Sequence, residues 1–169
     1  MNVAEMIDIY DENRNKTDLQ LPRKTKLVKG QFMLYVLALI ENEEGKILVT
    51  QRALDKKWAA GAWEIPGGGA MAGETSADAV CREIFEETGL DISKADAGVI
   101  YSYKNEDLKS GDNYFADIYR CRLPFTMDDL RIDRTEAIDV KLVTWEEIQT
   151  LQEQNGFLHY KRLCEAMEE

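Results

Sequence analysis

The sequence predicts a layered domain in which helices pack on a mixed β-sheet, an α/β architecture. Residues 32–40 are all apolar and are bounded by turn residues, which is typical of a central strand that is covered on both faces. Residues 75–88 have the periodicity of an amphipathic helix, with strand-like segments before and after them. A length of 169 residues fits a single domain over 1–169, because it is enough for one core and short for two.

The elements before this helix are predicted in order from the N-terminus. Residues 1–30 are expected to form an N-terminal extension with an edge strand at 5–10, a polar turn-rich segment and a basic stretch at 23–29. After the central strand, the turn Glu43-Glu44-Gly45-Lys46 leads to a returning strand at 47–52. A glycine-rich loop then covers residues 61–73.

The elements after the helix are predicted to complete the sheet and to cover it. Strands are expected near 98–103, 113–122 and 138–144. Two C-terminal helices are expected at about 145–153 and 157–167, because Asn155-Gly156 is a strong helix stop.

Charge and cysteine content narrow the class of protein. The chain has 32 acidic and 21 basic residues, a net charge of −11, so stable nucleic-acid binding through the phosphate backbone is not expected. Three scattered cysteines and a single histidine, His159, do not predict a zinc site. No signal peptide is evident, and the longest apolar run is too short to cross a bilayer, so a cytoplasmic protein without membrane association is expected.

The helix at 75–88 carries several local signals for its ends and its buried side. Thr75 and Asp78 form a capping-box pattern, and Gly89 can end the helix in the left-handed conformation. The apolar stripe that is expected to face the core consists of Ala77, Val80, Cys81 and Ile84.

Three glutamates, Glu83, Glu86 and Glu87, lie at i, i+3 and i+4 on the other side of this helix. Like charges at that spacing cost roughly 0.2–0.5 kcal/mol per pair on an isolated helix. A divalent cation such as Mg²⁺ or Mn²⁺, which prefers carboxylate oxygens, would compensate for the repulsion. A solvated helix face is the simpler alternative.

The loop before the helix favours the cation. Three glycines follow Pro66 and allow the backbone to approach a ligand or a metal without a Cβ in the way. From Gly68 the sequence is Gly68-x5-Glu74-x7-Arg82-Glu83-Ile84-x-Glu86-Glu87-x-Gly89-Leu90, which resembles the Nudix box GX5EX7REUXEEXGU at every specified position. The chain thus resembles the Nudix (MutT-like) hydrolases, and residues 61–68 and 143–148 are similar to the segments that flank the box in that family.

The resemblance implies a Nudix-type α/β/α sandwich with a mixed sheet over about residues 30–168. It implies that Glu83, Glu86 and Glu87, with the backbone carbonyl of Gly67, hold one or more Mg²⁺ or Mn²⁺ ions and carry the catalysis. Glu74 and Arg82 would pair to lock the loop against the helix. Structural support would come from the matched residues Gly68, Glu74, Arg82 and Gly89.

Residues outside the box are weaker candidates for the site. Glu136 precedes the strand at 138–144, where family members often carry a further acidic ligand or base, so we expect it to be catalytic. Glu106 and Asp112 are alternatives for that role, and the identity of the general base stays open between Glu83 and a residue of a later loop. Arg52 is expected to bind a substrate phosphate, and Trp58 or Tyr103 to stack on a base or sugar.

Three N-terminal segments, at 9–13, 21–23 and 27–30, resemble the branch related to isopentenyl-diphosphate isomerase, which contains isomerases and hydrolases. An isomerase of that branch would need histidine ligands and a catalytic cysteine, and His159 is the only histidine. The sequence therefore favours hydrolysis of the pyrophosphate linkage in a nucleoside diphosphate linked to another moiety. An isomerase-like enzyme and a non-catalytic nucleotide-binding module are the alternatives, and a homodimer that exchanges the N-terminal strand stays open.

Overall fold

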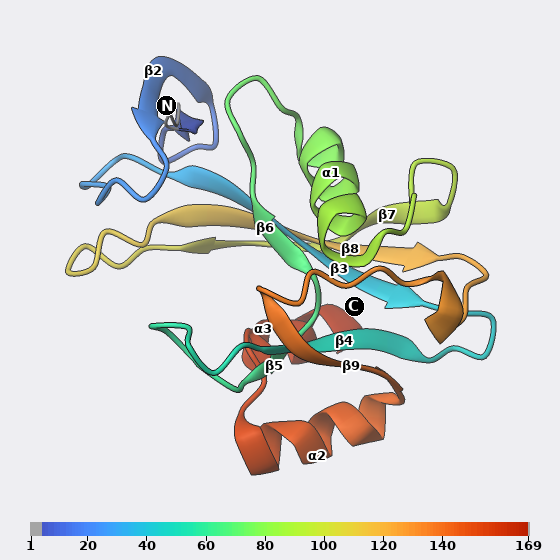
Figure 1. Ribbon diagram of the computed structural model, residues 1–169. Helices are drawn as coiled ribbons and strands as arrows, with labels where there is room; N and C mark the ends of the chain where they lie inside the picture. The colour runs from blue at the N-terminus through green and yellow to red at the C-terminus, as the bar shows by residue number, and fades with distance from the viewer. Residues whose placement is uncertain (1–4, 169) are drawn as a thin grey trace.

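The computed structural model describes residues 5–168, and its central feature is a mixed seven-stranded sheet (Figure 1). The path through the sheet is β5-β4-β3-β8-β7, with β6 paired to β3 and β9 paired to β4. The strands are β3 (Met33–Glu41), β4 (Ile47–Arg52), β5 (Trp63–Glu64), β6 (Gly67–Gly69), β7 (Asp96–Asn105), β8 (Tyr114–Arg122) and β9 (Ala137–Val143).

The central strand β3 is buried on both faces, as its uninterrupted apolar run predicts. It pairs in parallel with β8 along its whole length and antiparallel with β6, which makes the sheet mixed. Val36, Ala38 and Ile40 belong to one core with residues of helix α1 (Ser76–Thr88). Leu37 and Leu39 belong to a second core with residues of helices α2 (Trp145–Asn155) and α3 (Tyr160–Glu168).

The two cores give three layers, with α1 on one side of the sheet and α2 and α3 on the other (Figure 1). The predicted α/β/α sandwich is therefore confirmed. A short 3₁₀ helix at Met127–Asp129 precedes β9 and was not predicted. No helix within residues 5–168 is long and apolar enough to span a membrane.

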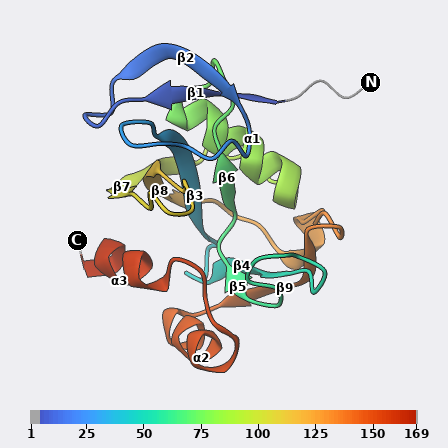
Figure 2. The same cartoon turned by 90° about the vertical axis from the view of Figure 1, so that its left-hand side faces the viewer.

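The N-terminal extension differs from its prediction. The expected edge strand is present as β1 (Met6–Tyr10), but it pairs with an unpredicted strand, β2 (Lys16–Pro22), in a separate two-stranded sheet. Strand β2 alternates Thr17, Leu19 and Leu21 with polar residues, but it is mostly exposed and lies in a polar, turn-rich stretch, and no strand is predicted there from the sequence. Figure 2 shows this β1–β2 hairpin crossing above β3 and next to α1.

The predicted glycine-rich loop contains regular structure as well. Gly67, Gly68 and Gly69 form β6, which pairs with Leu37, Val36 and Tyr35 of β3. A Cβ at Gly67 would overlap the backbone carbonyl oxygen of Val36, so only glycine permits this approach. The predicted helix at 157–167 begins later, at Tyr160, because His159 has a positive φ of 60° that a helix interior does not tolerate.

Candidate active site

Helix α1 begins and ends at the predicted signals. Thr75 and Asp78 form the capping box, and Gly89 adopts the left-handed conformation at the C-terminus. The predicted buried stripe is wrong at one position, since Ala77 is exposed and Ala79 is fully buried in its place. Ala79, Val80 and Ile84 pack into the core, and Cys81 is only partly buried beside them.

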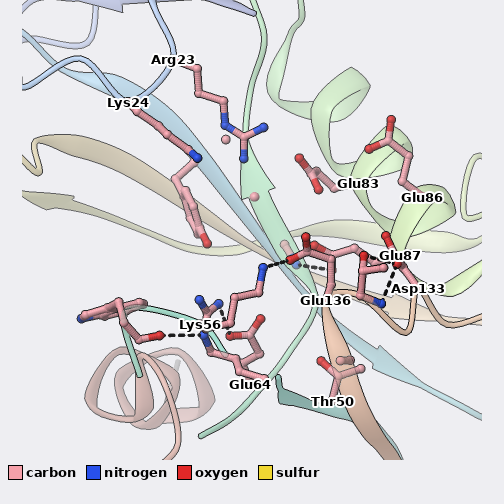
Figure 3. Close-up of a pocket in the computed structure, with 18 of the residues that line it drawn as sticks. Arg23, Lys24, Thr50, Lys56, Glu64, Glu83, Glu86, Glu87, Asp133 and Glu136 are labelled. Carbon is pink, nitrogen blue, oxygen red and sulfur yellow. Dashed lines mark hydrogen bonds and ion pairs between the residues drawn. The ribbon is translucent and has the colours of Figure 1, made fainter. Parts of the chain in front are cut away.

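A pocket of about 1020 Å³ lies between α1, β6, the end of β2, the β4–β5 loop and the segment before β9 (Figure 3). Its acidic lining side chains include Glu64, Glu83, Glu86, Glu87, Asp133 and Glu136. Its basic lining side chains are Arg23, Lys24, Arg52, Lys56, Lys57 and Arg82. Acidic and basic groups from five separate segments of the chain therefore meet in one open cavity.

The glycines of β6 make room for the carboxylates of α1. A Cβ at Gly68 would overlap the carboxylate of Glu83, which is buried against this strand. The backbone N–H of Gly67 donates a hydrogen bond to Glu87 Oε2 at 3.2 Å. Glu86 lies further out, with its side chain 57% exposed. The glutamates of the predicted face therefore differ in exposure, from the buried Glu83 to the exposed Glu86.

Burial and crowding raise the pKa values of the inner carboxylates. Burial, followed by the charges of Glu83 and Glu64, raises the pKa of Glu87 well above its usual range. Burial also raises the pKa of Glu83, although the positive charge of Arg82 opposes the shift. For Glu64, burial again raises the pKa against the neighbouring Arg52. Concentrated negative charge of this kind favours a bound cation.

Arg82 joins the connection between β6 and α1 to the helix itself through hydrogen bonds. Its Nε and Nη2 atoms donate to the two oxygens of Glu74 at 2.7 and 3.0 Å, and Nη2 also donates to the Gly69 carbonyl at 3.1 Å. Its Nη1 atom donates to Glu83 and Glu86 at 3.1 and 3.2 Å. The expected pairing of Arg82 with Glu74 is present, and it fixes the strand of glycines against α1.

The residues present fit a hard divalent cation in their chemistry. Carboxylates from α1 and from the strand β5 face one cavity, and a glycine backbone forms its wall. Arg82 already binds two of these carboxylates, and among residues 5–168 no three acidic, histidine or cysteine side chains converge closely enough to enclose an ion as they stand. A cation at Glu83 or Glu86 would compete with their hydrogen bonds from Arg82.

The structure brings the other predicted site residues into the same pocket. The segment before β9 is joined to the end of α1, because the Arg131 N–H donates to the Thr88 carbonyl at 2.8 Å, and this connection places Glu136 in the pocket. The carboxylate of Glu136 forms an ion pair with Lys56 (Figure 3). Arg52 Nη1 lies 3.3 Å from Glu64 Oε2, and the Arg52 guanidinium lies 5.5 Å from the centre of the Trp58 ring.

Other candidates lie elsewhere. Glu106 and Asp112 belong to the β7–β8 connection and are not among the residues that line the pocket. Tyr103 is buried in the second core, where its hydroxyl lies 3.3 Å from His159 Nδ1, so the suggested stacking role is wrong for this residue. Cys81, Cys121 and Cys164 are free thiols outside the pocket lining.

Several charged pocket residues lie outside the predicted set, among them Glu64, Arg23 and Lys24. Glu64 comes from β5, and its signal is its position three residues before Gly67, the first residue of the glycine strand. Arg23 and Lys24 follow β2 and begin the basic stretch at 23–29, for which the sequence predicts no role in the site. Nothing in the sequence indicated that the hairpin returns to the pocket, because β2 itself was not predicted.

Comparisons with known proteins agree with this geometry. A family model described as NUDIX domain matches residues 31–164. An uncharacterized Nudix hydrolase of Listeria monocytogenes is 31% identical over 154 residues, which cover 90% of this chain and 88% of the relative. An uncharacterized Nudix hydrolase of Listeria innocua is 32% identical over 162 residues, covering 95% and 92%.

Solved structures show the same fold. The structure of DR0079 from Deinococcus radiodurans has a TM-score of 0.71 at 19% identity, and the match covers 90% of this chain and 92% of that one. The MutT protein from Methanosarcina mazei has a TM-score of 0.62 at 26% identity, with coverage of 78% and 88%. The chain therefore belongs to the Nudix (MutT-like) family of pyrophosphohydrolases.

Proposed function

We propose that this protein hydrolyses the pyrophosphate linkage of a nucleoside diphosphate linked to another moiety, in a reaction that depends on Mg²⁺ or Mn²⁺. The observation that carries the proposal is the packing of Glu83 and Glu87 against the glycine strand β6, with Glu64, Glu86 and Glu136 around the same cavity. Unneutralised carboxylates would repel a diphosphate, so a cation must lie between them and the substrate.

The proposed ligands are the carboxylates of Glu83, Glu86 and Glu87 and the carbonyl oxygen of Gly67. Once bound, the ion would polarise the phosphoryl oxygens and lower the pKa of a nearby water. In the reaction a bond forms between the water oxygen and phosphorus, and the anhydride P–O bond breaks. The water proton would pass to a carboxylate of the pocket, with Glu83 and Glu136 as the two candidates for the general base.

Basic residues would hold the substrate in this arrangement. Arg52, which lines the pocket at the end of β4, would bind a phosphate oxygen through its guanidinium. Trp58 is 62% exposed at the edge of the pocket and would stack on the base.

The isomerase-like alternative is not favoured. The one histidine of the sequence, His159, is partly buried beside Tyr103 and is not a pocket residue. A non-catalytic module that binds a nucleotide is the second candidate. The Nudix domain of Shewanella oneidensis NrtR, which was crystallised with ADP ribose, shares the fold with a TM-score of 0.63 at 18% identity.

The test is a panel of nucleoside diphosphate derivatives, assayed for phosphate-containing products with Mg²⁺, with Mn²⁺ and with a chelator. We expect turnover only with metal, and a loss of at least about a hundredfold in kcat for Glu87→Gln and for Glu83→Gln. Glu146→Gln, which changes an exposed glutamate of α2, is the control and should match the wild type.

Unchanged activity in both α1 variants would refute the metal-site assignment. Tight binding of a panel compound without turnover under either metal would instead support the binding module. Metal-dependent conversion of isopentenyl diphosphate would revive the isomerase alternative.

A further inference from the structure

The β1–β2 hairpin lies outside residues 31–164 that match the family, yet it is fixed to the active site. The backbone N–H of Ala72 donates to the Met6 carbonyl at 2.8 Å, and the N–H of Gly73 donates to Asp8 Oδ2 at 2.8 Å. Both donors belong to the connection between β6 and α1. The hairpin is therefore hydrogen-bonded to the loop that carries the glutamate helix.

The end of this hairpin turns into the pocket. Residues 22–25 form a tight turn in which the Thr25 N–H donates to the Pro22 carbonyl at 3.2 Å. Arg23 and Lys24 are its two central residues, and both line the pocket. Figure 3 shows their side chains across the cavity from Glu83 and Glu87, with their ends directed into the space between.

Most cations around the pocket already have an acidic partner. Arg52 pairs with Glu64, Lys56 with Glu136, and Arg82 with Glu74 and its neighbours. Arg23 pairs with Glu5 at 2.8 Å, but both side chains are about half exposed, so this pair is weak. Within residues 5–168, the two pocket-lining cations with no ion pair are Lys24 on the hairpin side and Lys57 beside Trp58.

The two ends of the pocket are thus chemically different. At the β4–β5 loop, the exposed ring of Trp58 lies over Arg52, whose Nε atom also donates to the Trp58 carbonyl at 3.2 Å. An aromatic plane held in this way suits a base. At the hairpin end, a neutral sugar would leave the ammonium of Lys24 without a counter-charge, whereas a phosphate would supply one.

We infer that Arg23 and Lys24, supplied by the N-terminal hairpin, are specificity-determining residues that bind an anionic terminal group of the substrate. The inference rests on the proposed hydrolysis. It gives the bound substrate a direction, with the base at Trp58, the scissile anhydride at the α1 glutamates and a terminal phosphate at Lys24. The preferred moiety beyond the nucleoside diphosphate is then a phosphate group and not a neutral sugar.

The test compares a nucleoside triphosphate with a nucleoside diphosphate sugar of the same base. Lys24→Asn is the informative variant, because Lys24 has a positive φ of 72° that asparagine tolerates without the charge. We expect kcat/KM for the triphosphate to fall about tenfold, mainly through KM, with little change for the diphosphate sugar. Lys24→Arg should restore the preference, and Lys29→Ala, an exposed change on the same segment, should leave it unchanged.

Lys57→Ala tests the direction of binding. A larger loss of triphosphate preference in Lys57→Ala than in Lys24→Asn would overturn the inference, as would equal losses on both substrates in Lys24→Asn. If the wild type hydrolyses neither compound, the proposed hydrolysis is decided by the wider panel, separately from this inference. The inference is then tested by calorimetry with Mg²⁺ and methylene-bridged analogues that carry two or three phosphates, where only Lys24→Asn should lose the tighter binding of the triphosphate analogue.

Discussion

Glu87 lies where its ionised carboxylate destabilises the folded protein. Its carboxylate is surrounded by the negative charges of Glu83 and Glu64, and the Gly67 N–H is the hydrogen-bond donor that faces it. A raised carboxylate pKa means that the folded state binds a proton more tightly than the unfolded state does. The ionised carboxylate therefore destabilises the fold until a cation or a proton neutralises it.

Replacing Glu87 by glutamine should stabilise the metal-free protein at pH 7.5 while it abolishes activity. The penalty in the wild type is fully present above the folded pKa and disappears as the pH falls toward the unfolded value of about 4.3. In thermal unfolding with a chelator, the Tm of Glu87→Gln should accordingly be a few degrees above that of the wild type at pH 7.5. When the pH is lowered from 7.5 to 5, the Tm should rise less in Glu87→Gln than in the wild type.

Adding Mg²⁺ should raise the Tm of the wild type and leave that of Glu87→Gln nearly unchanged, because ligand binding stabilises only a state that can bind. An equal rise in both proteins would argue against Glu87 as a ligand. Glu146→Gln, on the surface of α2, provides the control for a nonspecific effect of charge.

Arg82 works through its planar shape as well as its charge. Its guanidinium contacts two oxygens of Glu74, the Gly69 carbonyl, Glu83 and Glu86, and these partners raise its pKa further. Lysine retains the charge but cannot form this set of directed bonds. We expect Arg82→Lys to lose about 2 kcal/mol of unfolding free energy in urea, whereas a loss below about 0.5 kcal/mol would show that charge alone suffices.

At the scale of elements, the connection from β6 to α1 decides where the glutamates lie. The helix was predictable because its cap, its C-terminal glycine and its period are local signals. The exposure of Ala77 was not predictable from the sequence, because the sheet beneath the helix determines which of its sides faces the core. The pairing of three glycines with β3 was likewise not predictable from the sequence, because glycine is not a residue that favours strands.

Alanine substitutions separate packing from chemistry in this strand. Gly67→Ala should be strongly destabilising, by more than about 2 kcal/mol, because its Cβ would overlap backbone atoms of β3 that cannot move away. Gly68→Ala should keep more stability but lose activity, since its Cβ would displace the Glu83 side chain. Urea unfolding and turnover assays distinguish the two, and Gly98→Ala, whose Cβ would meet open space, is the control.

At the scale of the whole molecule, Asp117 joins the hairpin to the sandwich. This buried carboxylate on β8 accepts hydrogen bonds from Nη1 and Nη2 of Arg14, at 2.7 and 2.6 Å. It also accepts from Ser76 at the start of α1 and from Ser102 on β7. Burial opposes ionisation, but these donors lower the pKa of Asp117 below its usual value.

Asp117→Asn should therefore cost about 3 kcal/mol of unfolding free energy at pH 7, because Arg14 loses its buried partner. A lowered pKa gives stability that is present above the unfolded value of about 3.9 and is lost as the pH falls through the folded value. The deficit of the variant should stay constant from pH 8 to 5 and shrink below pH 4. Urea unfolding at three pH values measures this, with the exposed Asp18→Asn on β2 as the control.

The sequence by itself determined the apolar central strand, the capped glutamate helix and the spacing that identifies the family, because each depends on residues that are close together in the chain. Only the tertiary structure decided that Glu64 of β5 and the hairpin residues Arg23 and Lys24 share the pocket with that helix. The position of the hairpin depends on polar contacts across long stretches of chain, such as Arg14 with Asp117, and a pairing between distant residues has no local signal in the sequence. Local interactions determine the helix that carries the glutamates, and long-range packing brings the residues that face it.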